Sequence, residues 1–416
     1  MRKHLGLAEQ IFTVVSLLHY SGGPVSLILT GGSGDVVSSA GNDNSLVKLL
    51  FFLIYVVTFF LLVARWKKVI YLIRKDRVIG VLMGMVFVSL LWSVAPTSTL
   101  IRAFALVGTT LFGIYLATRY SMRQQLQMLA WMFCIAIVLS LLFGVILRNY
   151  GVHTSGDLAG NWRGIYVHKN VLGAVMSLSA IVFFLLAIGI KRNRWLLWCG
   201  FSFSIILLLL STSKTSLLKV VQLLALILVC RPLRWRYEMM IPGIIALITI
   251  GGSLYVWFTT NAETVLGSIG KDATLTGRTD LWPFVWDLIE KRPWLGYGYS
   301  GLWLNWDSET AYVWRAIGWI APNSHNGFLD LLLQFGILGL SIFLLGFCAN
   351  LVRALAWVRL SRTPEGFWPM VYMVYTVLSN LTETSVLQQN DLFWVLFVAV
   401  TLSIIRSPEQ ETKVLA

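Results

Sequence analysis

Charged residues are scarce in this chain of 416 residues: Asp, Glu, Lys and Arg make up 12% of it, against about a quarter in ordinary soluble domains. A soluble globule of this length needs a charged surface, whereas here 57% of the residues are hydrophobic and the mean hydropathy is +0.75. Four single cysteines in apolar stretches, without CxxC or CxxH spacing, indicate small buried side chains rather than disulfides or metal ligands. These shortages exclude a soluble enzyme, a disordered chain and a secreted disulfide scaffold, and they predict an all-α polytopic membrane protein.

Long apolar runs account for most of the chain, and twelve of them approach the roughly 20 residues that a membrane-spanning helix needs. These stretches are residues 10–30, 46–64, 78–95, 98–117, 125–147, 168–190, 195–212, 215–230, 239–259, 326–350, 366–383 and 391–406. The first contains the run Ser21-Gly22-Gly23-Pro24, which predicts a kink or break. We expect one integrated membrane domain, and its parts are a nine-span bundle at 1–259, a large loop at 260–325, and three spans with a short tail at 326–416.

The basic excess, a net charge of +14, is distributed unevenly between the two sides of this layout. With the N-terminus inside, the cytoplasmic segments hold 21 of the 33 Lys and Arg, and the opposite side holds ten, five of them in the large loop. Lys48 and Arg102 are the two counted within spans, where snorkelling is the simplest expectation. The positive-inside rule therefore predicts that both termini are cytoplasmic and that the large loop lies on the outer face. The charge reflects topology and contact with anionic lipid headgroups, and no nucleic-acid partner is expected.

The large loop has a composition of its own, with seven of the eighteen tryptophans. Within it, residues 279–291 predict a short amphipathic helix that begins at Thr279, has a proline in its first turn and lies on the membrane surface. Trp282, Trp286 and Ile289 share one face of that helix. The tryptophans serve either as an aromatic anchor at the membrane interface or as a surface that grips sugar rings.

The first of four polar clusters on the outer side is Asn323-Ser324-His325-Asn326-Gly327, where the large loop enters the tenth span. Asn323 or Ser324 is expected to cap that helix, which places His325 near its N-terminus. A helix N-terminus favours the neutral imidazole, which is able to accept a proton near neutral pH. His325 is therefore a candidate general base, and the alternative is a simple polar cap.

Two further clusters place single cations on the same side. Arg278 follows a glycine at the start of the predicted surface helix, a position suited either to holding a phosphate with the help of backbone amides or to pairing with lipid headgroups. Lys214 lies in the polar run 211–216 between two very apolar spans. A lysine there opposes the general charge bias and suits an anionic lipid-linked substrate.

The fourth cluster, residues 161–170, enters the sixth span and carries His168 together with Arg163 and Lys169. These two cations either join the same anion site or anchor the helix at the interface. The large loop has no D-x-D pair, no His, Asp or Glu cluster has metal-ligand spacing, and Asp307 and Glu309 are expected to be solvated. A reaction without a metal or another cofactor is therefore expected.

The run Asn323–Asp330, followed by Leu333–Gly339, resembles the motif of the Wzy/O-antigen ligase (Wzy_C) superfamily. Those proteins are bacterial inner-membrane glycosyltransferases that use undecaprenyl-pyrophosphate-linked glycans on the periplasmic side. Segments 167–173, 211–215 and 277–282 resemble the ExoQ-type exopolysaccharide branch and follow one another in the expected order. The resemblance implies about twelve transmembrane helices, a large periplasmic loop containing short amphipathic helices, and a periplasmic active site.

Residue by residue, the resemblance implies that His325 is the essential loop histidine, Arg278 the loop arginine, and Lys214 the basic residue after a serine-rich turn, where many ligases carry arginine. His325 is then the general base for an attacking sugar hydroxyl. The cations expected to hold the pyrophosphate leaving group are Lys214, Arg278, Lys169 and Arg163. The supporting residues are His168 and Asn326.

The activity that the resemblance implies is polymerisation of undecaprenyl-pyrophosphate-linked repeat units into an exopolysaccharide or O-antigen-like polymer, metal-independent and with inversion at the anomeric carbon. Its implied partners are the lipid-linked glycan donor, a glycan or lipid acceptor, membrane lipids, and chain-length regulator and export proteins. Two alternatives stay open. One is an O-antigen ligase that transfers the glycan to lipid A-core; the other is a transporter or flippase, which needs ionisable residues at mid-membrane and paired inverted repeats.

Overall fold

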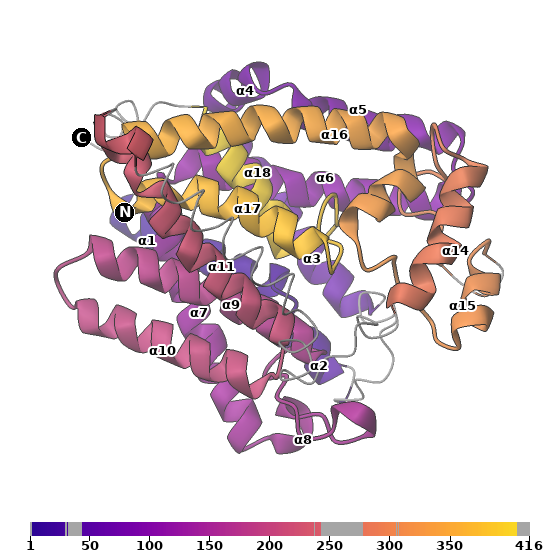
Figure 1. Ribbon diagram of the computed structural model, residues 1–416, viewed down its shortest axis with the longest axis horizontal. Coiled ribbons are helices and arrows are strands. Elements are labelled where there is room, and N and C mark those ends of the chain that lie inside the picture. Colours follow the sequence, from indigo (N-terminus) through magenta and orange to yellow (C-terminus); the bar gives the residue numbers. More distant parts are fainter. Residues whose placement is uncertain are drawn as a thin grey trace.

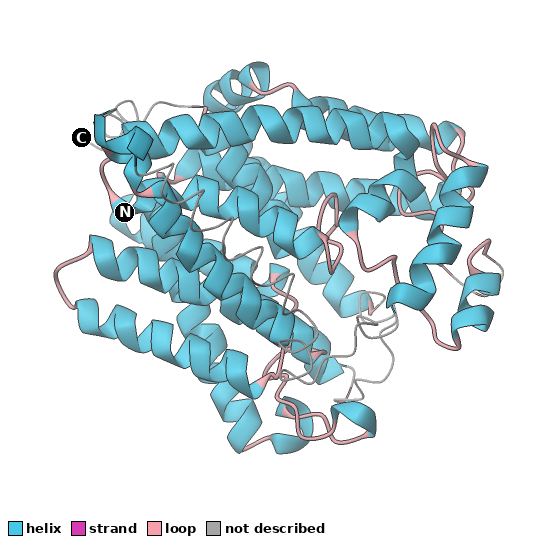
Figure 2. Ribbon diagram, in the orientation of Figure 1, coloured by secondary structure: helices cyan, strands magenta, loops and turns pink. Residues whose placement is uncertain are grey.

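The computed structural model describes residues 2–29, 31, 44–236, 238–242, 278–304, 306 and 308–405. Over these residues the chain is a bundle of helices joined by turns and loops, with one isolated β-bridge and no strand (Figures 1 and 2). The predicted all-α class is confirmed for this part of the chain. Most of the predicted ninth span, the loop up to residue 277, Asp307 and the tail from residue 406 lie outside the described residues.

The helices fall mostly on the apolar stretches of the sequence. Their bounds are α1 Arg2–Tyr20, α2 Val25–Leu29, α3 Ser45–Val63, α4 Trp66–Lys75, α5 Val78–Val88, α6 Pro96–Arg119, α7 Met122–Val145, α8 Arg148–Gly151, α9 Lys169–Gly189, α10 Arg194–Leu210, α11 Lys214–Cys230, α14 Arg278–Lys291, α15 Ala311–Ile317, α16 Gly327–Leu360, α17 Trp368–Asn380 and α18 Leu392–Ser403. Of these helices, α4, α8, α14 and α15 lie between the apolar stretches. The predicted break in the first span is present, because α1 ends before Gly22, whose φ is 86°, and α2 begins after it.

Length and apolar composition make six of the described helices able to cross a membrane. They are Ser45–Val63, Pro96–Arg119, Met122–Val145, Lys169–Gly189, Lys214–Arg234 and Gly327–Leu360. Shorter apolar helices cover Val78–Leu91, Arg194–Leu210 and Leu392–Ser403. The protein is therefore a membrane protein, and the full set of twelve spans stays a prediction.

The helix ends gather at two opposite ends of the bundle. At one end, Gln125 near the start of α7 donates a hydrogen bond to Ser403 at the end of α18 (2.9 Å). At the other end, Trp162 before α9 donates its amide to the carbonyl of Leu210 at the end of α10 (3.1 Å). We call the first end the Glu9 side, after the network described next, and the second, which holds the starts of α9, α11 and α16, the histidine side.

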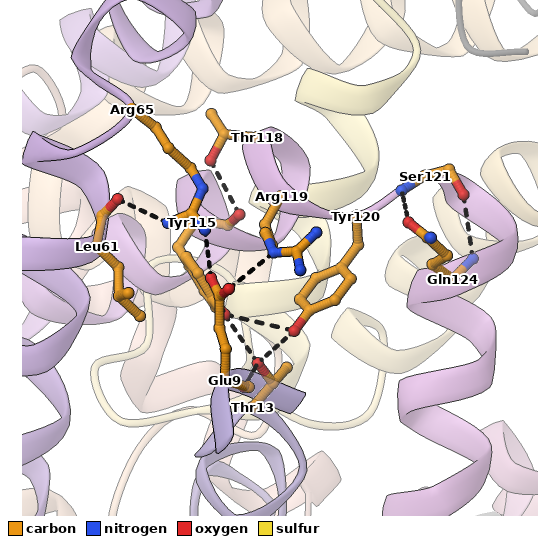
Figure 3. A network of polar contacts seen from close by, with 10 residues as sticks. All are labelled: Glu9, Thr13, Leu61, Arg65, Tyr115, Thr118, Arg119, Tyr120, Ser121 and Gln124. Carbon is orange, nitrogen blue, oxygen red and sulfur yellow. Dashed lines mark hydrogen bonds and ion pairs between the residues drawn. The ribbon is translucent and has the colours of Figure 1, made fainter. Parts of the chain in front are cut away.

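A polar network joins three helices on the Glu9 side (Figure 3). The carboxylate of Glu9 in α1 lies 2.6 Å from Nη2 of Arg65, just after α3, and 3.0 Å from Nε of Arg119 at the end of α6. The hydroxyl of Tyr115 donates to the same carboxylate (3.2 Å) and lies 3.0 Å from the hydroxyl of Thr13. One acid from α1 therefore neutralises two cations from helices that end on this side.

α16 is interrupted near the histidine side at Gly336, whose φ of 61° and ψ of −162° are not helical. The segment 293–298 fills the interruption, and the amide of Tyr297 donates to the carbonyl of Leu333 (2.7 Å). A β-carbon on Gly336 would overlap the backbone of Trp294. Glycine therefore permits both the turn and the close approach of a segment from the large loop.

α14 packs on the first half of α16 mainly through its leucines and Val285. Leu281, Val285 and Leu288 are fully buried in a second core with residues of α16, whereas the side chain of Trp286 is 49% exposed. Of the face predicted from Trp282, Trp286 and Ile289, Ile289 is buried in the same core and Trp282 packs against it, so that only Trp286 is exposed. The helix also begins one residue earlier than predicted, which places Pro283 beyond its first turn.

Two expectations about single residue types are wrong. Cys199 and Cys348 are exposed on their helices and only Cys230 is buried, although all four cysteines are free. The guanidinium of Arg102, near the start of α6, donates to the carbonyl (2.7 Å) and hydroxyl (2.9 Å) of Ser300, and its snorkelling stays a prediction. A further basic residue lies inside a span: Lys219 of α11 is 3% exposed. The predicted tenth span is also longer than expected, since α16 continues to residue 360.

Candidate active site

The turn before α16 is built around His325. Its φ of 52° lies in the left-handed region, which is uncommon for a residue other than glycine and concentrates at functional sites. The side chain of Asn323 supports the turn by accepting the amide of His325 (2.9 Å). The helix cap is Asn326, whose Oδ1 accepts two amides of the first turn of α16 (3.0 and 3.2 Å). The predicted caps Asn323 and Ser324 are thus wrong, because their side chains bond within the turn instead.

A second loop, between α17 and α18, lies against the first. Asp330 of α16, 2% exposed, joins them by accepting the amide of Ser324 (3.1 Å) and the hydroxyl of Thr384. A β-carbon on Gly327 would overlap Oδ1 of Asn380 at the end of α17. The glycine of the histidine motif therefore allows the two loops to pack closely.

The second loop brings a carboxylate to His325. Oε2 of Glu383 lies 3.4 Å from Nδ1 of His325, and the backbone carbonyl of Glu383 accepts the amide of Gly327 (3.2 Å). The ring of Trp319 lies 5.7 Å from the imidazole between centroids. The side chains of His325 and Glu383 are 20% and 37% exposed, so the pair is open to solvent.

His168 is the cap of α9, because its Nδ1 accepts the amide of Asn170 (3.1 Å). Burial lowers the pKa of His168 below its ordinary value, and the carboxylate of Glu383 opposes that shift. The positive charges that add to it belong to Lys169, His325 and Arg163. The starts of α9 and α16, far apart in sequence, are therefore within electrostatic range of each other.

The two predicted lysines meet at the same end of the bundle. Nζ of Lys169 donates to Thr212 (3.1 Å), which in turn donates to the side chain of Asn161 (2.9 Å). Thr212 has a left-handed φ of 53°, two residues before Lys214, the first residue of α11. Lys214 is exposed, and its charge and that of Lys169 repel each other. Two cations close enough to repel favour an anion between them.

Arg163 is not available for an anion site. It is 1% exposed, and its guanidinium donates to the carbonyls of Tyr150 (2.8 Å) and Asn149 (3.1 Å). The prediction that it holds pyrophosphate is therefore corrected: it fastens the loop before α9 to the end of α8. Sequence alone could not separate it from Lys169, because both are cations of the polar segment that leads into the same helix.

Arg278 is the first residue of α14, and its side chain lies outside the described residues. The turn that it begins is near the histidine motif, because Nε1 of Trp282 donates to the carbonyl of Ser324 (3.1 Å). Figure 1 shows α14 beside the start of α16. The backbone therefore brings the Arg278 position to the same end of the bundle as His325.

Sequence reasoning missed two ionisable residues here. Glu383 belongs to no motif, and only the contact between the two loops shows its place beside His325. Lys219 was counted among the outer-side cations, yet its Nζ donates to Ser379 of α17 (3.3 Å) and lies over the ring of Tyr375 (5.7 Å). Its position inside a very apolar stretch was the available signal.

The described residues hold no group of three or more His, Cys, Asp or Glu that could bind a metal ion. What they hold is the imidazole of His325 with a carboxylate beside one nitrogen, within electrostatic range of His168, which is itself within range of Lys169. Such an arrangement can accept a proton from a hydroxyl and can stabilise a pyrophosphate.

Comparison with known proteins gives two findings. Residues 199–344 match the O-antigen ligase family (Wzy_C), a region that includes the polar run 211–216, Arg278 and the histidine motif. The chain is also 26% identical over 270 residues to the "Exopolysaccharide production protein ExoQ" of Rhizobium meliloti (strain 1021), a match that covers 61% of this chain and 59% of that protein. These matches confirm the resemblance that the sequence motifs predicted, to the O-antigen ligase family and, within it, to a protein of exopolysaccharide production.

Proposed function

We propose that the protein polymerises undecaprenyl-pyrophosphate-linked repeat units on the periplasmic side of the bacterial inner membrane. The observation that carries the proposal is the convergence of His325, His168, Lys169 and Lys214 on the histidine side of a helical membrane bundle. The family match and the similarity to an exopolysaccharide production protein support a glycan substrate.

The proposed reaction is a single displacement. A hydroxyl of one glycan attacks the anomeric carbon of another, whose bond to the pyrophosphate oxygen breaks, and both electrons of that bond leave with undecaprenyl pyrophosphate. His325 takes the proton of the attacking hydroxyl, a role typically worth about 10²–10⁴-fold in rate. With no protein nucleophile involved, the configuration at the anomeric carbon inverts.

Negative charge accumulates on the leaving pyrophosphate, so fixed cations beside it lower the barrier. We assign this role to Lys214, Lys169 and Arg278. Arg163 is left out because its guanidinium is buried on backbone carbonyls. The bond between the anomeric carbon and the pyrophosphate oxygen supplies the driving force, so the proposed reaction uses no nucleotide. In this proposal the cations of the chain stabilise the pyrophosphate in place of a metal ion.

A ligase is the second candidate, favoured by the description of the matching family. The two functions share the donor and the displacement and differ in the acceptor. Purified protein supplied with a lipid-linked repeat unit alone, in excess chelator, separates them. A ladder of longer glycans supports a polymerase, and strict dependence on added lipid A-core supports a ligase.

The same assay tests the site and the remaining alternative. His325→Ala is expected to lower the rate by about 10²–10⁴-fold while the protein stays folded, and undiminished product would rule out His325 as the base. Lys219 inside α11 is an ionisable residue of the kind that transporters use. Movement of the lipid-linked unit between leaflets without any longer glycan would therefore replace the proposal by a flippase.

A further inference from the structure

We infer that Glu383 is a positioning residue for His325: its carboxylate accepts a hydrogen bond from Nδ1–H and leaves Nε2 as the nitrogen that takes the proton. The inference rests on the proposed function for the role of His325, and on the 3.4 Å contact between Oε2 and Nδ1 for the pairing. A contact of this length is long for a hydrogen bond, and catalytic hydrogen bonds commonly tighten when the substrate binds.

The backbone on both sides of the pair is held in place. The carbonyl of Glu383 accepts the amide of Gly327, and its own amide donates to Ser379 at the end of α17 (2.8 Å). Asp330 joins the two loops through Ser324 and Thr384. The pairing of the two side chains thus follows from two packed loops, in contrast to ordinary exposed ion pairs, which lose much of their energy to side-chain entropy.

The imidazole ring itself has limited freedom. His325 is held in the left-handed region by the side chain of Asn323, and its ring tilts by 47° against that of Trp319. A general base is effective only if the accepting nitrogen stays aimed at the hydroxyl. The carboxylate on Nδ1 adds the remaining constraint, because it selects one tautomer.

The carboxylate of Glu383 also stabilises positive charge on the imidazole of His325. A site that gathers lysines for a pyrophosphate disfavours a new positive charge on a nearby imidazole. His168 at α9 lies within electrostatic range of both Glu383 and His325, and Asp330 in α16 lies within range of His325. Lys169 and Arg163 in turn lie within range of His168. Glu383 supplies a negative charge in direct contact with the ring, where the imidazolium forms as the hydroxyl loses its proton.

The tautomer is open to direct measurement, because the chain has only five histidines. We expect ¹⁵N NMR of histidine-labelled protein in detergent, with His325→Gln used to assign the signal, to show the Nδ1–H form. Glu383→Ala should populate the Nε2–H form. Glu383→Gln keeps an acceptor and should retain the Nδ1–H form without the charge. An unchanged tautomer in Glu383→Ala would overturn the inference.

Activity gives an independent readout. Glu383→Ala is expected to slow polymerisation about tenfold to a hundredfold, less than the roughly 10²–10⁴-fold that the general base itself contributes, and Glu383→Asp should restore part of the rate. In a His325→Ala background, Glu383→Ala should cost nothing further, because the two residues act as one unit. Glu290→Ala, an exposed acid of α14, is the matched control and should leave the rate unchanged.

The outcomes separate the inference from the proposed function. If the wild-type protein makes no longer glycan while the Nδ1–H tautomer of His325 still depends on Glu383, the proposed function fails and the pairing stands. If His325→Ala stays fully active, His325 is not the base and Glu383 has no role in the rate. If His325→Ala is inactive while Glu383→Ala has wild-type rate and tautomer, the inference fails and the proposed function stands. Additive losses in the double variant would also reject the pairing.

Discussion

His168 combines a cap and a titratable group in one side chain. Its Nδ1 must be unprotonated to accept the amide of Asn170, and burial lowers its pKa below the ordinary value of 6.5. The unfolded chain therefore binds this proton more readily than the folded one. The stability contributed by neutral His168 is present above pH 6.5 and is lost as the pH falls through the folded-state pKa.

We expect the thermal midpoint of the detergent-solubilised protein to fall as the pH is lowered from 7.5 to 5. His168→Asn keeps a capping oxygen and cannot titrate in this range, so its midpoint should fall less. Tryptophan fluorescence recorded during heating measures the thermal midpoints of the wild type and of His168→Asn. Equal declines in the two proteins would show that His168 does not carry the effect.

The two proposed phosphate ligands should respond differently to conservative exchange. Arg278→Lys removes a planar donor pair, and the loss of one charge-assisted hydrogen bond, about 1.5–3 kcal/mol, predicts a rate lower by about tenfold or more. Lys214→Arg keeps the charge and should change the rate little, because arginine is common in the family at this place. Polymerisation rates of the two variants with the lipid-linked unit test this prediction. A larger loss of rate for Lys214→Arg than for Arg278→Lys would reverse the assignment.

At the residue scale, the sequence was informative wherever chemistry coincided with a helix start. His325, His168, Lys169 and Lys214 each lie within two residues of one, and these positions follow from the hydropathy pattern. The burial of Arg163 and the pairing of Glu383 depend on contacts between distant segments. No local pattern reports such contacts, which is why both were missed.

Gly336 shows how one position shapes an element. Its left-handed backbone and the neighbouring Trp294 leave no room for a β-carbon. Gly336→Ala should lower the free energy of unfolding by about 3 kcal/mol, from backbone strain and overpacking together. It should also reduce activity, because the segment 293–298 and the histidine turn lie at the same end of α16.

A matched control is Gly84→Ala in α5, where a β-carbon meets no atom within 4 Å. Alanine is the better helix former, so this variant should be as stable as the wild type or slightly more so. Chemical denaturation of both variants in detergent is the measurement. A Gly336→Ala protein as stable as Gly84→Ala would mean that the interruption of α16 is not required.

Glu9 joins α1 to the ends of α3 and α6, so replacing it should affect how these three helices are held together. Glu9→Gln should leave Arg65 and Arg119 facing each other without a carboxylate and destabilise the bundle by about 2 kcal/mol. The pair of Arg236 and Glu238 is the control, because its side chains are 86% and 80% exposed. Glu238→Gln is expected to have no measurable effect on the thermal midpoint, and equal effects of the two changes would contradict the role of the network.

Hydropathy predicted the position of a helix well where the whole helix is apolar. It predicted poorly how a helix packs where only one of its faces is apolar. The break after α1 follows from its Ser-Gly-Gly-Pro run. The interruption of α16 does not, since Gly336 lies within a continuous apolar stretch. In α14 the predicted face contributes Ile289 and part of Trp282 to the core, but Leu281, Val285 and Leu288, which were not assigned to it, fill most of the space against α16.

For the whole molecule, alternation of the helix ends is an independent argument for topology. The end of α3, the end of α6 and the start of α7 lie on the Glu9 side, while the starts of α9, α11 and α16 lie on the histidine side. Consecutive helices that cross in opposite directions produce this arrangement. This arrangement does not show which of the two sides is cytoplasmic.

The distribution of basic residues predicts which side is cytoplasmic. Position 192, between α9 and α10 on the Glu9 side, lies in a segment with three Lys and Arg at 191–194, whereas Thr154 lies in an exposed stretch on the histidine side. In a background without the four native cysteines, a membrane-impermeant thiol reagent should label Thr154→Cys in intact cells, and should label Arg192→Cys only after permeabilisation. This pattern follows from the positive-inside rule and places the histidine side in the periplasm. Labelling of Arg192→Cys alone in intact cells would invert the molecule, and it would remove the proposed active site from the periplasmic face.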